Sequence, residues 1–552
     1  MRYIQSNPIF YGFTISFHHS KEVFVCSLIV SLRCVFWVAL SIRVGGIDSP
    51  RPASQRAAAL VLTAALLTGA AFPAFADTYY IEDGDITISA GKTEGTNKVS
   101  QGSTTDEEDT DTVITNNNRD TASSHTVTID AGNDKVEVTL DNVNIKADSG
   151  SALTSNGDVT LTLKGENHLT GGNGDTYGGD GITSSGSLTI SGGTVTATGG
   201  NNTGSDGSGG SGIYSVSGSV TISGGTVNAT GGEGSKNNST SGGSGIYSDS
   251  GDVTISGGTV NANGGNGGTI SGGDGICSSG GVTISSGSTV TANGGSGEDG
   301  SGGRGITSNG GVTVSGGTVN AKGGSGKNGN GGDGILSFNP VAISGGTVKS
   351  NGGSGTISGG DGIRSLDHVA ISGGTVKSNG GSGTNSGGYG IISNDIDLSG
   401  SLELTAKAGS PNGKALSQRG NELDLNTIKD KLGPGAKVTT TDADGKVNQV
   451  PIPGPVEPEE PVIPEESSSS SDGGSATPSA PASSLPGLTV TDKSGAVISY
   501  TSTQSGNTLT VCVGRFAASL RASLSTLRQL RAEGIETITF QTILCSTTLS
   551  VD

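Results

Sequence analysis

The chain has few aromatic and sulfur-containing residues. Aromatic residues make up 4% of its 552 residues, and the one tryptophan lies at position 37. Five cysteines are present, of which Cys277, Cys512 and Cys545 follow residue 76. So low a cysteine content excludes a disulfide-dense scaffold and indicates a fold that does not depend on disulfides. Cys512 and Cys545 are a candidate pair within the C-terminal region, and Cys277 is interpreted as a small residue at a variable repeat position.

Basic residues are also scarce relative to acidic ones. Lys and Arg number 31 against 50 Asp and Glu, which gives a formal net charge of −19 at pH 7. Proteins that bind nucleic acid depend on cationic contacts to phosphate, so this balance argues against a nucleic-acid partner. It also argues against direct attraction to anionic membranes or polyanions unless a cation bridges the two.

The sequence does have a long internal repeat. A Gly-Ile pair, a short alternating segment, Ser-Gly-Gly-Thr-Val or a near variant, and a glycine-rich segment recur eight times at spacings of 28 to 33 residues. A nearly constant period of this length is typical of a solenoid, whose units must stack on their neighbours to bury a core. The anchoring isoleucines are Ile182, Ile213, Ile246, Ile276, Ile306, Ile335, Ile363 and Ile391.

Within one repeat, apolar residues alternate with polar ones. Val282, Ile284, Val290 and Ala292 fall on one face at a period of two, which predicts strands and fits no helix. Three short strands in each repeat predict an all-β, right-handed parallel β-helix. Its identical positions would stack about 4.8 Å apart. The rival interpretation is a disordered glycine-rich chain (glycine is 99 of 552 residues), but disorder gives no reason for the apolar residues to keep their register. The glycine-rich loops are expected to be mobile.

The N-terminus is interpreted as a leader. Arg51 and Arg56 precede an apolar run, and Ala74-Phe75-Ala76 is a small-x-small cleavage site, which predicts a signal peptide cleaved after Ala76. Residues 1–44 are interpreted as a wrongly assigned translation start, because Met1 is the only methionine and a non-AUG start would not be visible. The alternative is an N-terminal membrane anchor, so a membrane contact is expected only through an uncleaved leader.

The rest of the chain divides by composition. Residues 77–150 are expected to form an N-terminal cap and the first strands, 151–410 the β-helix repeats, and 411–450 a C-terminal cap. Residues 451–487 are rich in Pro, Glu and Ser, which predicts a disordered linker. Residues 488–552 predict a small α+β module with strands near 509–513 and 537–540 flanking a helix from Arg515 to about Ala532. This module is a candidate site for a protein partner.

Two groups of segments carry a family resemblance. The first comprises the alternating block Val138–Ile145 and the tetrad Gly150–Leu153, and the second comprises Val159–Leu169 and the repeated Asp-Gly-Ile and Ser-Gly-Gly-Thr-Val units. Together they resemble the secreted carbohydrate-binding domain family of Gram-positive bacteria, a parallel β-helix related in architecture to pectin-active proteins. The resemblance covers roughly residues 78–450. It implies binding of polysaccharide, including acidic pectin-type glycans with calcium, and it implies no catalysis. The sequence departs from the family in its long Gly/Ser/Asn loops and its number of copies.

Aspartates at one repeat position are candidate metal ligands. Two of them belong to successive repeats, so their carboxylates are expected within about 5 Å, a spacing that calcium tolerates. The alternative is that each aspartate accepts a turn hydrogen bond beside glycine. The period near 30 does not fit the nine-residue calcium repeat of β-rolls. The four aspartates directly precede Gly-Ile: Asp180, Asp274, Asp333 and Asp361.

Outward-facing positions are candidate ligand-binding residues. Seven threonines share one repeat position and predict a row of hydroxyls: Thr194, Thr226, Thr259, Thr289, Thr318, Thr347 and Thr375. Two places on, a second polar row is expected from Thr196, Asn228, Asn261, Thr291, Asn320, Lys349 and Lys377. Thr and Asn are also ordinary residues of exposed strands, so these rows have a purely structural alternative. Tyr214 and Tyr247 are candidate stacking residues for a sugar, or a plain tyrosine ladder.

No catalytic constellation is visible. Glycosidases need paired carboxylates at short range, and no such pair recurs. The three histidines after residue 76 fall in different repeats, and Arg304 and Arg364 have no recurring acids around them. The sequence therefore predicts a secreted or cell-surface, non-catalytic protein that binds carbohydrate, with calcium as the candidate ion. The alternative hypothesis is a surface adhesin or structural spacer, and the third hypothesis is a pectate-lyase-like enzyme.

Overall fold

The computed structural model describes residues 77–450 except 237. In a C-terminal unit it describes 488–491, 498, 500–513, 518–522, 524–541 and 546–550. The chain divides into two compact units, residues 1–458 and 459–552, and each is described by itself. The predicted leader, signal peptide, linker (451–487) and Cys545 lie outside the described residues.

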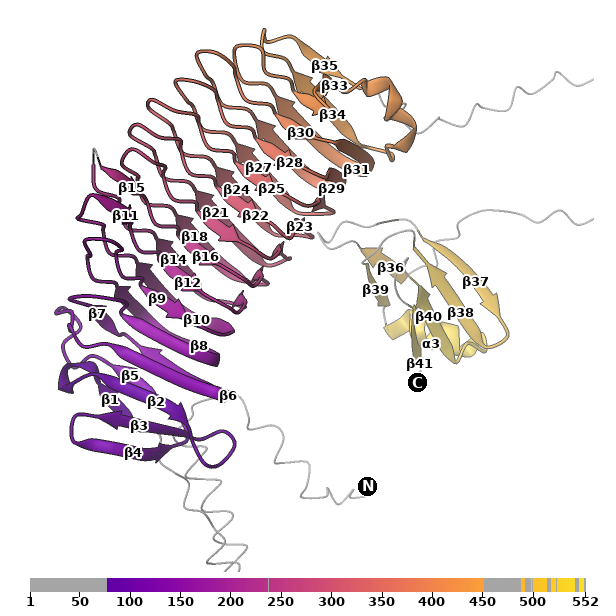
Figure 1. Cartoon of the computed structure of the whole chain (residues 1–552). Coiled ribbons are helices and arrows are strands. Elements are labelled where there is room, and N and C mark those ends of the chain that lie inside the picture. The colour runs from indigo at the N-terminus through magenta and orange to yellow at the C-terminus, as the bar shows by residue number, and fades with distance from the viewer. Residues whose placement is uncertain are drawn as a thin grey trace, which may run out of the picture. The chain divides into compact units, whose positions relative to one another are not determined.

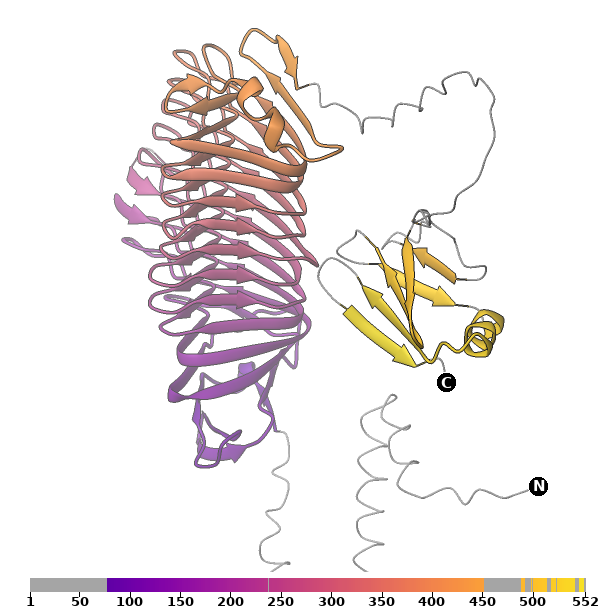
Figure 2. The same ribbon diagram turned by 90° about the vertical axis from the view of Figure 1, so that its right-hand side faces the viewer.

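The larger unit is a parallel β-solenoid of about 13 turns, which confirms the predicted stacking of repeats (Figures 1 and 2). Each regular coil contributes three short strands, and each strand pairs in parallel with the same strand of the next coil. Val282, for example, lies opposite Val253 on one side and Val312 on the other. Residues at the same position of successive repeats therefore lie opposite each other.

The strands form three columns along the solenoid. Column A comprises β9 (Ile182–Ser184), β12 (Ile213–Ser215), β16 (Ile246–Ser248), β19 (Ile276–Ser278), β22 (Ile306–Ser308), β25 (Ile335–Ser337), β28 (Ile363–Ser365), β30 (Ile391–Ser393) and β32 (Leu416–Gln418). Column B comprises β13 (Val220–Ile222), β17 (Val253–Ile255), β20 (Val282–Ile284), β23 (Val312–Val314) and β26 (Val341–Ile343). Column C comprises β14 (Thr226–Thr230), β18 (Gly258–Asn263), β21 (Ser288–Asn293), β24 (Thr318–Lys322) and β27 (Thr347–Asn351).

In some coils columns B and C merge into one long strand. The merged strands are β10 (Leu188–Thr198), β29 (His368–Asn379) and β31 (Asp395–Lys407). Earlier coils are built from β6 (Val127–Asp141), β7 (Asn144–Lys146) and β8 (Leu153–Thr170), and β34 (Lys437–Thr441) ends column C. Val159 and Leu161, which lie in the range expected for the repeats (151–410), are thus part of the solenoid, because β8 pairs in parallel with β10.

The core consists of stacked aliphatic side chains. The isoleucines that open the column A strands and the alternating Val, Ile and Ala of columns B and C are at most 1% exposed from Ile182 to Ile391. They belong to one continuous cluster that extends from Tyr79 to Val450. Since the period-two pattern points these residues inward in every coil, each coil extends the core of its neighbour.

Two features shape the corners between columns. In most Ser-Gly-Gly-Thr corners the second glycine has a left-handed backbone, as at Gly317 with φ of 74°, a conformation that favours glycine. Serines at the end of the column A strands point inward, and most of their hydroxyls donate to corner carbonyls, whereas Ser337 Oγ has no partner among the described residues. Ser248 Oγ, for instance, donates to Gly251 O at 2.8 Å and to Gly218 O at 3.1 Å. These inward hydroxyls were not anticipated from the sequence.

The glycine-rich segments form regular hydrogen bonds between coils, and their expected mobility stays a prediction. Pairs of glycines leaving and re-entering each coil form a continuous hydrogen-bonded layer. Gly303 N donates to Gly295 O and Gly324 N donates to Gly303 O, both at 2.8 Å. An added Cβ at Gly295 would lie 2.0 Å from the carbonyl oxygen of Gly265. Only glycine allows the backbones of neighbouring coils to approach this closely. The glycines are therefore required for the close packing of these segments. Two loops add short strands, β11 (Asp206–Ser208) and β15 (Ser239–Ser241).

Antiparallel strands close both ends of the solenoid, as expected for caps that cover the exposed coil. In the N-terminal cap β3 pairs antiparallel with β2 and β4, and in the C-terminal cap β33 and β35 pair antiparallel with β32 and β34. The N-terminal cap comprises β1 (Thr78–Tyr80), η2 (Ile81–Asp83), β2 (Ile86–Ala90), β3 (Asn97–Gln101), β4 (Thr104–Asp109) and β5 (Val113–Thr115). The C-terminal cap comprises β33 (Asn421–Glu422), η3 (Leu425–Thr427), η4 (Lys429–Lys431) and β35 (Val447–Gln449).

The C-terminal unit is a small α+β fold. Its strands β38 and β40 pair in parallel, and both lie where the sequence predicted strands. The predicted helix was wrong at residues 519–522, which form a strand paired with β36, and it was right from Leu524 to Ala532. The elements are β36 (Leu488–Thr491), β37 (Thr501–Ser505), β38 (Thr508–Cys512), β39 (Ser519–Ala522), α3 (Leu524–Ala532), β40 (Thr537–Gln541) and β41 (Ser546–Ser550). Among the described residues, no helix has the length and apolar character needed to span a bilayer.

Candidate functional site

The predicted threonine row is present on the outer surface of column C. Thr194 lies opposite Thr226, and the same pairing continues coil by coil through Thr259, Thr289, Thr318 and Thr347 to Thr375. All seven side chains are half-buried or exposed. Within the described part of the chain, none of the seven hydroxyls has a hydrogen-bond partner. The row therefore presents unused donors and acceptors about 4.8 Å apart along the solenoid.

Two further polar rows run beside it on the same surface. The predicted second row is in register from Thr196 to Lys377, and Asn261 Nδ2 donates to Asn228 Oδ1 at 2.8 Å. A third row was not anticipated, although the same alternation continues two residues further on in each strand. In it Asn293 Nδ2 donates to Asn263 Oδ1 at 2.8 Å. The third row comprises Thr198, Thr230, Asn263, Asn293, Lys322, Asn351, Asn379 and Lys407.

We call these three rows the polar face. An asparagine amide has two N–H donors and an oxygen with two lone pairs. Each contact along a ladder uses one N–H and one lone pair, so each amide retains hydrogen-bonding capacity toward solvent. The polar face thus combines hydroxyl, amide and, in its C-terminal half, ammonium groups in a regular array.

The two tyrosines lie on column A, away from the polar face. Tyr214 and Tyr247 occupy adjacent coils, and their rings stack with centroids 5.2 Å apart and an interplanar angle of 13°. Each ring therefore has one face covered by the other, and Tyr247 Oη donates to Asp249 Oδ1 at 2.7 Å. Burial, together with the neighbouring Asp249 carboxylate, raises the pKa of Tyr247. This arrangement fits the tyrosine-ladder alternative better than an open platform for a sugar.

The four aspartates also lie on column A, directly before its strands. Each directs a carboxylate oxygen to the backbone of the next coil: Asp180 Oδ1 accepts from Ser211 N at 2.6 Å, and Asp274 Oδ1 from Arg304 N at 2.6 Å. Threonine hydroxyls donate to the other oxygens of these two, Thr183 to Asp180 at 2.7 Å and Thr307 to Asp274 at 2.6 Å. From the sequence, each aspartate is expected to accept a hydrogen bond in a turn beside glycine. The aspartates do accept backbone hydrogen bonds, but these join successive coils and do not close a local turn.

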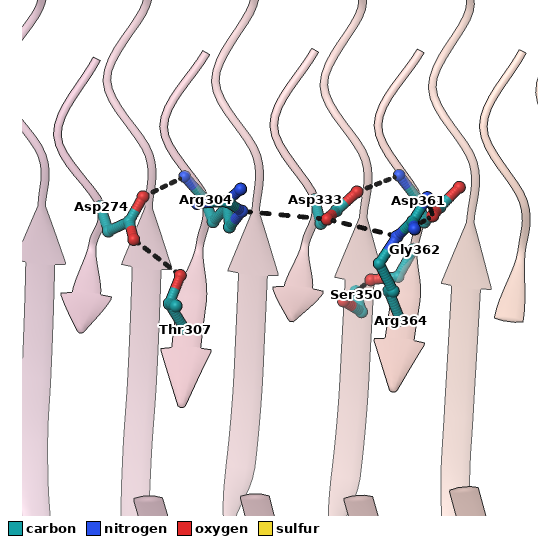
Figure 3. A network of polar contacts seen from close by, with 8 residues as sticks. All are labelled: Asp274, Arg304, Thr307, Asp333, Ser350, Asp361, Gly362 and Arg364. Atoms are coloured by element: carbon teal, nitrogen blue, oxygen red, sulfur yellow. Dashed lines mark hydrogen bonds and ion pairs between the residues drawn. The ribbon is translucent and has the colours of Figure 1, made fainter. Parts of the chain in front are cut away.

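Asp333 and Asp361 are on adjacent coils, as predicted, and two arginines lie with them (Figure 3). Asp333 Oδ1 accepts from Asp361 N at 2.7 Å, and its Oδ2 lies 3.9 Å from Arg304 Nε and 3.8 Å from Arg364 Nε. The sequence shows no recurring constellation of acids around these arginines, and the structure places Asp333 beside both of them at this one position. Burial and the adjacent Asp333 carboxylate raise the pKa of Asp361 to about 6, against the opposing effect of Arg364. Burial likewise raises the pKa of Asp333.

The aspartates are not gathered into one cluster. Asp274 is separated from Asp333 by the coil that carries Arg304, and the coils of Ser211 and Ser244 separate it from Asp180. No group of three or more His, Cys, Asp or Glu in metal-binding proximity occurs among the described residues. Calcium binding at the four aspartates stays a prediction. The hydrogen bonds from the backbone of the next coil to these carboxylates favour a structural role, in which each aspartate links two successive coils.

Comparisons of the chain with protein-family models, with curated proteins and with solved structures found no match.

Proposed function

We propose that the chain is an exported, non-catalytic carbohydrate-binding β-solenoid that holds an extended polysaccharide along its polar face. The observation that supports this most directly is the in-register row of seven threonine hydroxyls without partners among the described residues. A polymer of hydroxyl-rich units lying along the solenoid would meet a matching group in every coil. The resemblance to secreted carbohydrate-binding domains supports the same ligand class.

The proposal also includes binding of acidic polysaccharide with the help of calcium. The aspartate row lies on column A, and the polar face lies on column C. An ion at the aspartates would therefore serve a second surface or the stability of the coil. Binding measured with calcium and with EDTA separates these contributions.

The proposal is tested by removing hydroxyls while keeping shape. The variant Thr226→Val, Thr259→Val, Thr289→Val loses three hydroxyls of the row but keeps β-branched strand residues. Each of the three hydrogen bonds contributes about 1 kcal/mol net, so binding to insoluble or soluble polysaccharides is expected to weaken on the order of 100-fold.

The matched control changes the same chemistry on column B. Thr221, Thr254 and Thr283 form an equivalent half-buried row there, and their replacement by valine is expected to leave binding unchanged. Equal loss in both variants, or no binding of the unaltered protein to any polysaccharide in a broad panel, would overturn the proposal.

A surface adhesin or structural spacer is the second candidate. The core cluster is continuous from Tyr79 to Val450, and such a rod holds its ends at a fixed separation. In this function residues 488–552 would contact a protein partner. A chain that binds no glycan, but whose isolated C-terminal unit captures a partner protein, would favour it. The third hypothesis, a pectate-lyase-like enzyme, predicts that the protein releases products from polygalacturonate.

A further inference from the structure

Four lysines interrupt the neutral character of the polar face in its C-terminal half. Lys322 ends β24, Lys349 lies in β27, Lys377 in β29 and Lys407 ends β31. All four side chains are exposed. In the coils before them, the second and third rows hold only threonine and asparagine from Thr196 and Thr198 onward. We call these residues the lysine strip.

The strand register places the strip on four successive coils. Lys349 is directly opposite Lys377, whereas Lys322 is opposite Asn351 and Lys407 is opposite Asn379. Parallel strands lie about 4.8 Å apart, so the strip extends about 14 Å along the solenoid. The ammonium groups therefore follow the direction proposed for the polymer.

The strip lacks internal charge compensation. Three lysines elsewhere in the described chain pair with acids: Lys135 with Glu137 at 2.7 Å, Lys431 with Asp397 at 3.0 Å, and Lys327 with Glu298. Across the described residues, no ion pair involves a member of the strip. The nearest acid by register is Glu403, which lies opposite Thr375 and shares β31 with Lys407, and on its other side Glu403 is opposite Lys437.

The directly opposite pair Lys349 and Lys377 has an electrostatic cost. Like charges directly opposite each other on neighbouring strands are destabilising. The chain as a whole carries a net charge of −19, so four adjacent unpaired cations are a local reversal of its overall charge. An anionic ligand would remove the repulsion. The net charge therefore does not exclude a polyanion once the positions of the charges are known.

We propose that the lysine strip binds a linear anionic polysaccharide through its carboxylate or sulfate groups, without a bridging cation. This inference rests on the proposed function and assigns its ligand class. Lysine is a compact point charge, unlike the planar fork of arginine, so the strip would recognise charge density and accept either anionic group. The neutral rows of the same coils would contact the sugar hydroxyls.

The test compares two variants that change net charge equally. The strip variant carries Lys→Gln at positions 322, 349, 377 and 407, and the control carries Lys→Gln at positions 92, 164, 236 and 446, which are also exposed. The probes are polygalacturonate, heparin, a neutral polysaccharide bound by the unaltered protein, and single-stranded DNA, all in EDTA. The strip variant is expected to bind both anionic polysaccharides about 10- to 100-fold more weakly. The control is expected to bind like the unaltered protein, and added salt is expected to weaken binding.

Each outcome bears on the inference. Unchanged binding by the strip variant, or equal binding of DNA through the strip, overturns it. Loss of anionic but not neutral binding supports it. Failure of all anionic probes with retained neutral binding overturns this inference alone, whereas failure of every polysaccharide overturns the proposed function too. Carbodiimide cross-linking of polygalacturonate to the unaltered protein, mapped by mass spectrometry, must place the linked lysines in the strip. This last measurement does not depend on the folding of a variant.

Discussion

Arg364 donates through Nε to Asp361 Oδ2 at 2.7 Å, three residues away in the same coil. The other oxygen of Asp361 accepts the backbone N–H of Tyr389, one coil further on, at 2.6 Å. The Asp361 side chain is 3% exposed. One buried carboxylate therefore holds an arginine of its own coil and the backbone of the next, and it marks the position where successive coils are tied.

Removal of the arginine is expected to destabilise this part of the solenoid. In Arg364→Ala the buried Asp361 carboxylate loses its charged donor, and hydrogen bonds to charged groups contribute about 1.5–3 kcal/mol. Local unfolding, followed by amide hydrogen exchange at Tyr389, is expected to become easier by about 2 kcal/mol. Arg304→Ala is the control, because its Nε lies 3.9 Å from Asp333 and this contact is weaker. Equal effects in the two variants would contradict the assignment.

The stability contributed by Asp361 is expected to depend on pH. Its pKa is raised to about 6 by burial and by Asp333, against about 3.9 in the unfolded chain. Between these values the folded state keeps a proton that the unfolded state has released. Stability from this group is therefore present below pH ~4 and lost as pH rises through ~6, by about 2–3 kcal/mol.

The Asp361→Asn variant isolates this effect. The difference in unfolding free energy between the unaltered protein and the variant is expected to change across that pH window and to be flat outside it. A carboxyl carbon titration by NMR measures the pKa directly. A midpoint for Asp361 near the ordinary aspartate value would contradict the prediction.

The glycine layer is expected to tolerate no side chain. In Gly295→Ala the new Cβ would lie 2.0 Å from the carbonyl oxygen of Gly265, so the backbones must move apart. Overpacking of this kind costs about 1–3 kcal/mol, which urea unfolding would detect. Gly224→Ala is the matched control, because nothing lies within 4 Å of its Cβ, and it is expected to be neutral. If both variants unfold at the same urea concentration, the layer is not tightly packed.

Cys277 is expected to react slowly with alkylating reagents. Burial and the nearby Asp274 raise the pKa of its thiol to about 12. Only the thiolate reacts, so alkylation by iodoacetamide near pH 8 is expected to be on the order of 100- to 1,000-fold slower than in the urea-unfolded chain. Mass spectrometry of the peptide that contains Cys277 gives both rates. Similar rates in the folded and unfolded chain would show that the thiol is accessible.

Much of the fold was predictable because it depends on local alternation and repeat length. Val282 and Ile284 point inward in the strand and so do their equivalents, and the constant spacing leaves them opposite one another. The same reasoning located the threonine row from Thr194 to Thr375. The reasoning failed for residues 519–522, where the apolar spacing suits a helix but pairing with β36 forms a strand.

The candidate surfaces were only partly predictable. The sequence alone places Lys349 and Lys377 in one row. Lys322 and Lys407 belong to the neighbouring row, two positions further along the strand, and only the pairing of the strands brings them next to Lys349 and Lys377. The partners of Asp361 could not be foreseen either. Its hydrogen bond to Tyr389 N depends on how the backbone enters each coil.

The sequence by itself determined the number of coils that repeat, the direction in which their side chains point and the rows that identical residues form. A period of two within strands and of about 30 between them permits little else. The tertiary structure alone decided which charges meet, how the glycine segments hydrogen-bond between coils, and where the neutral face becomes cationic. These properties arise between neighbouring coils, because a contact between residues 28 to 34 positions apart depends on the exact stacking of two backbones and has no signature within either repeat.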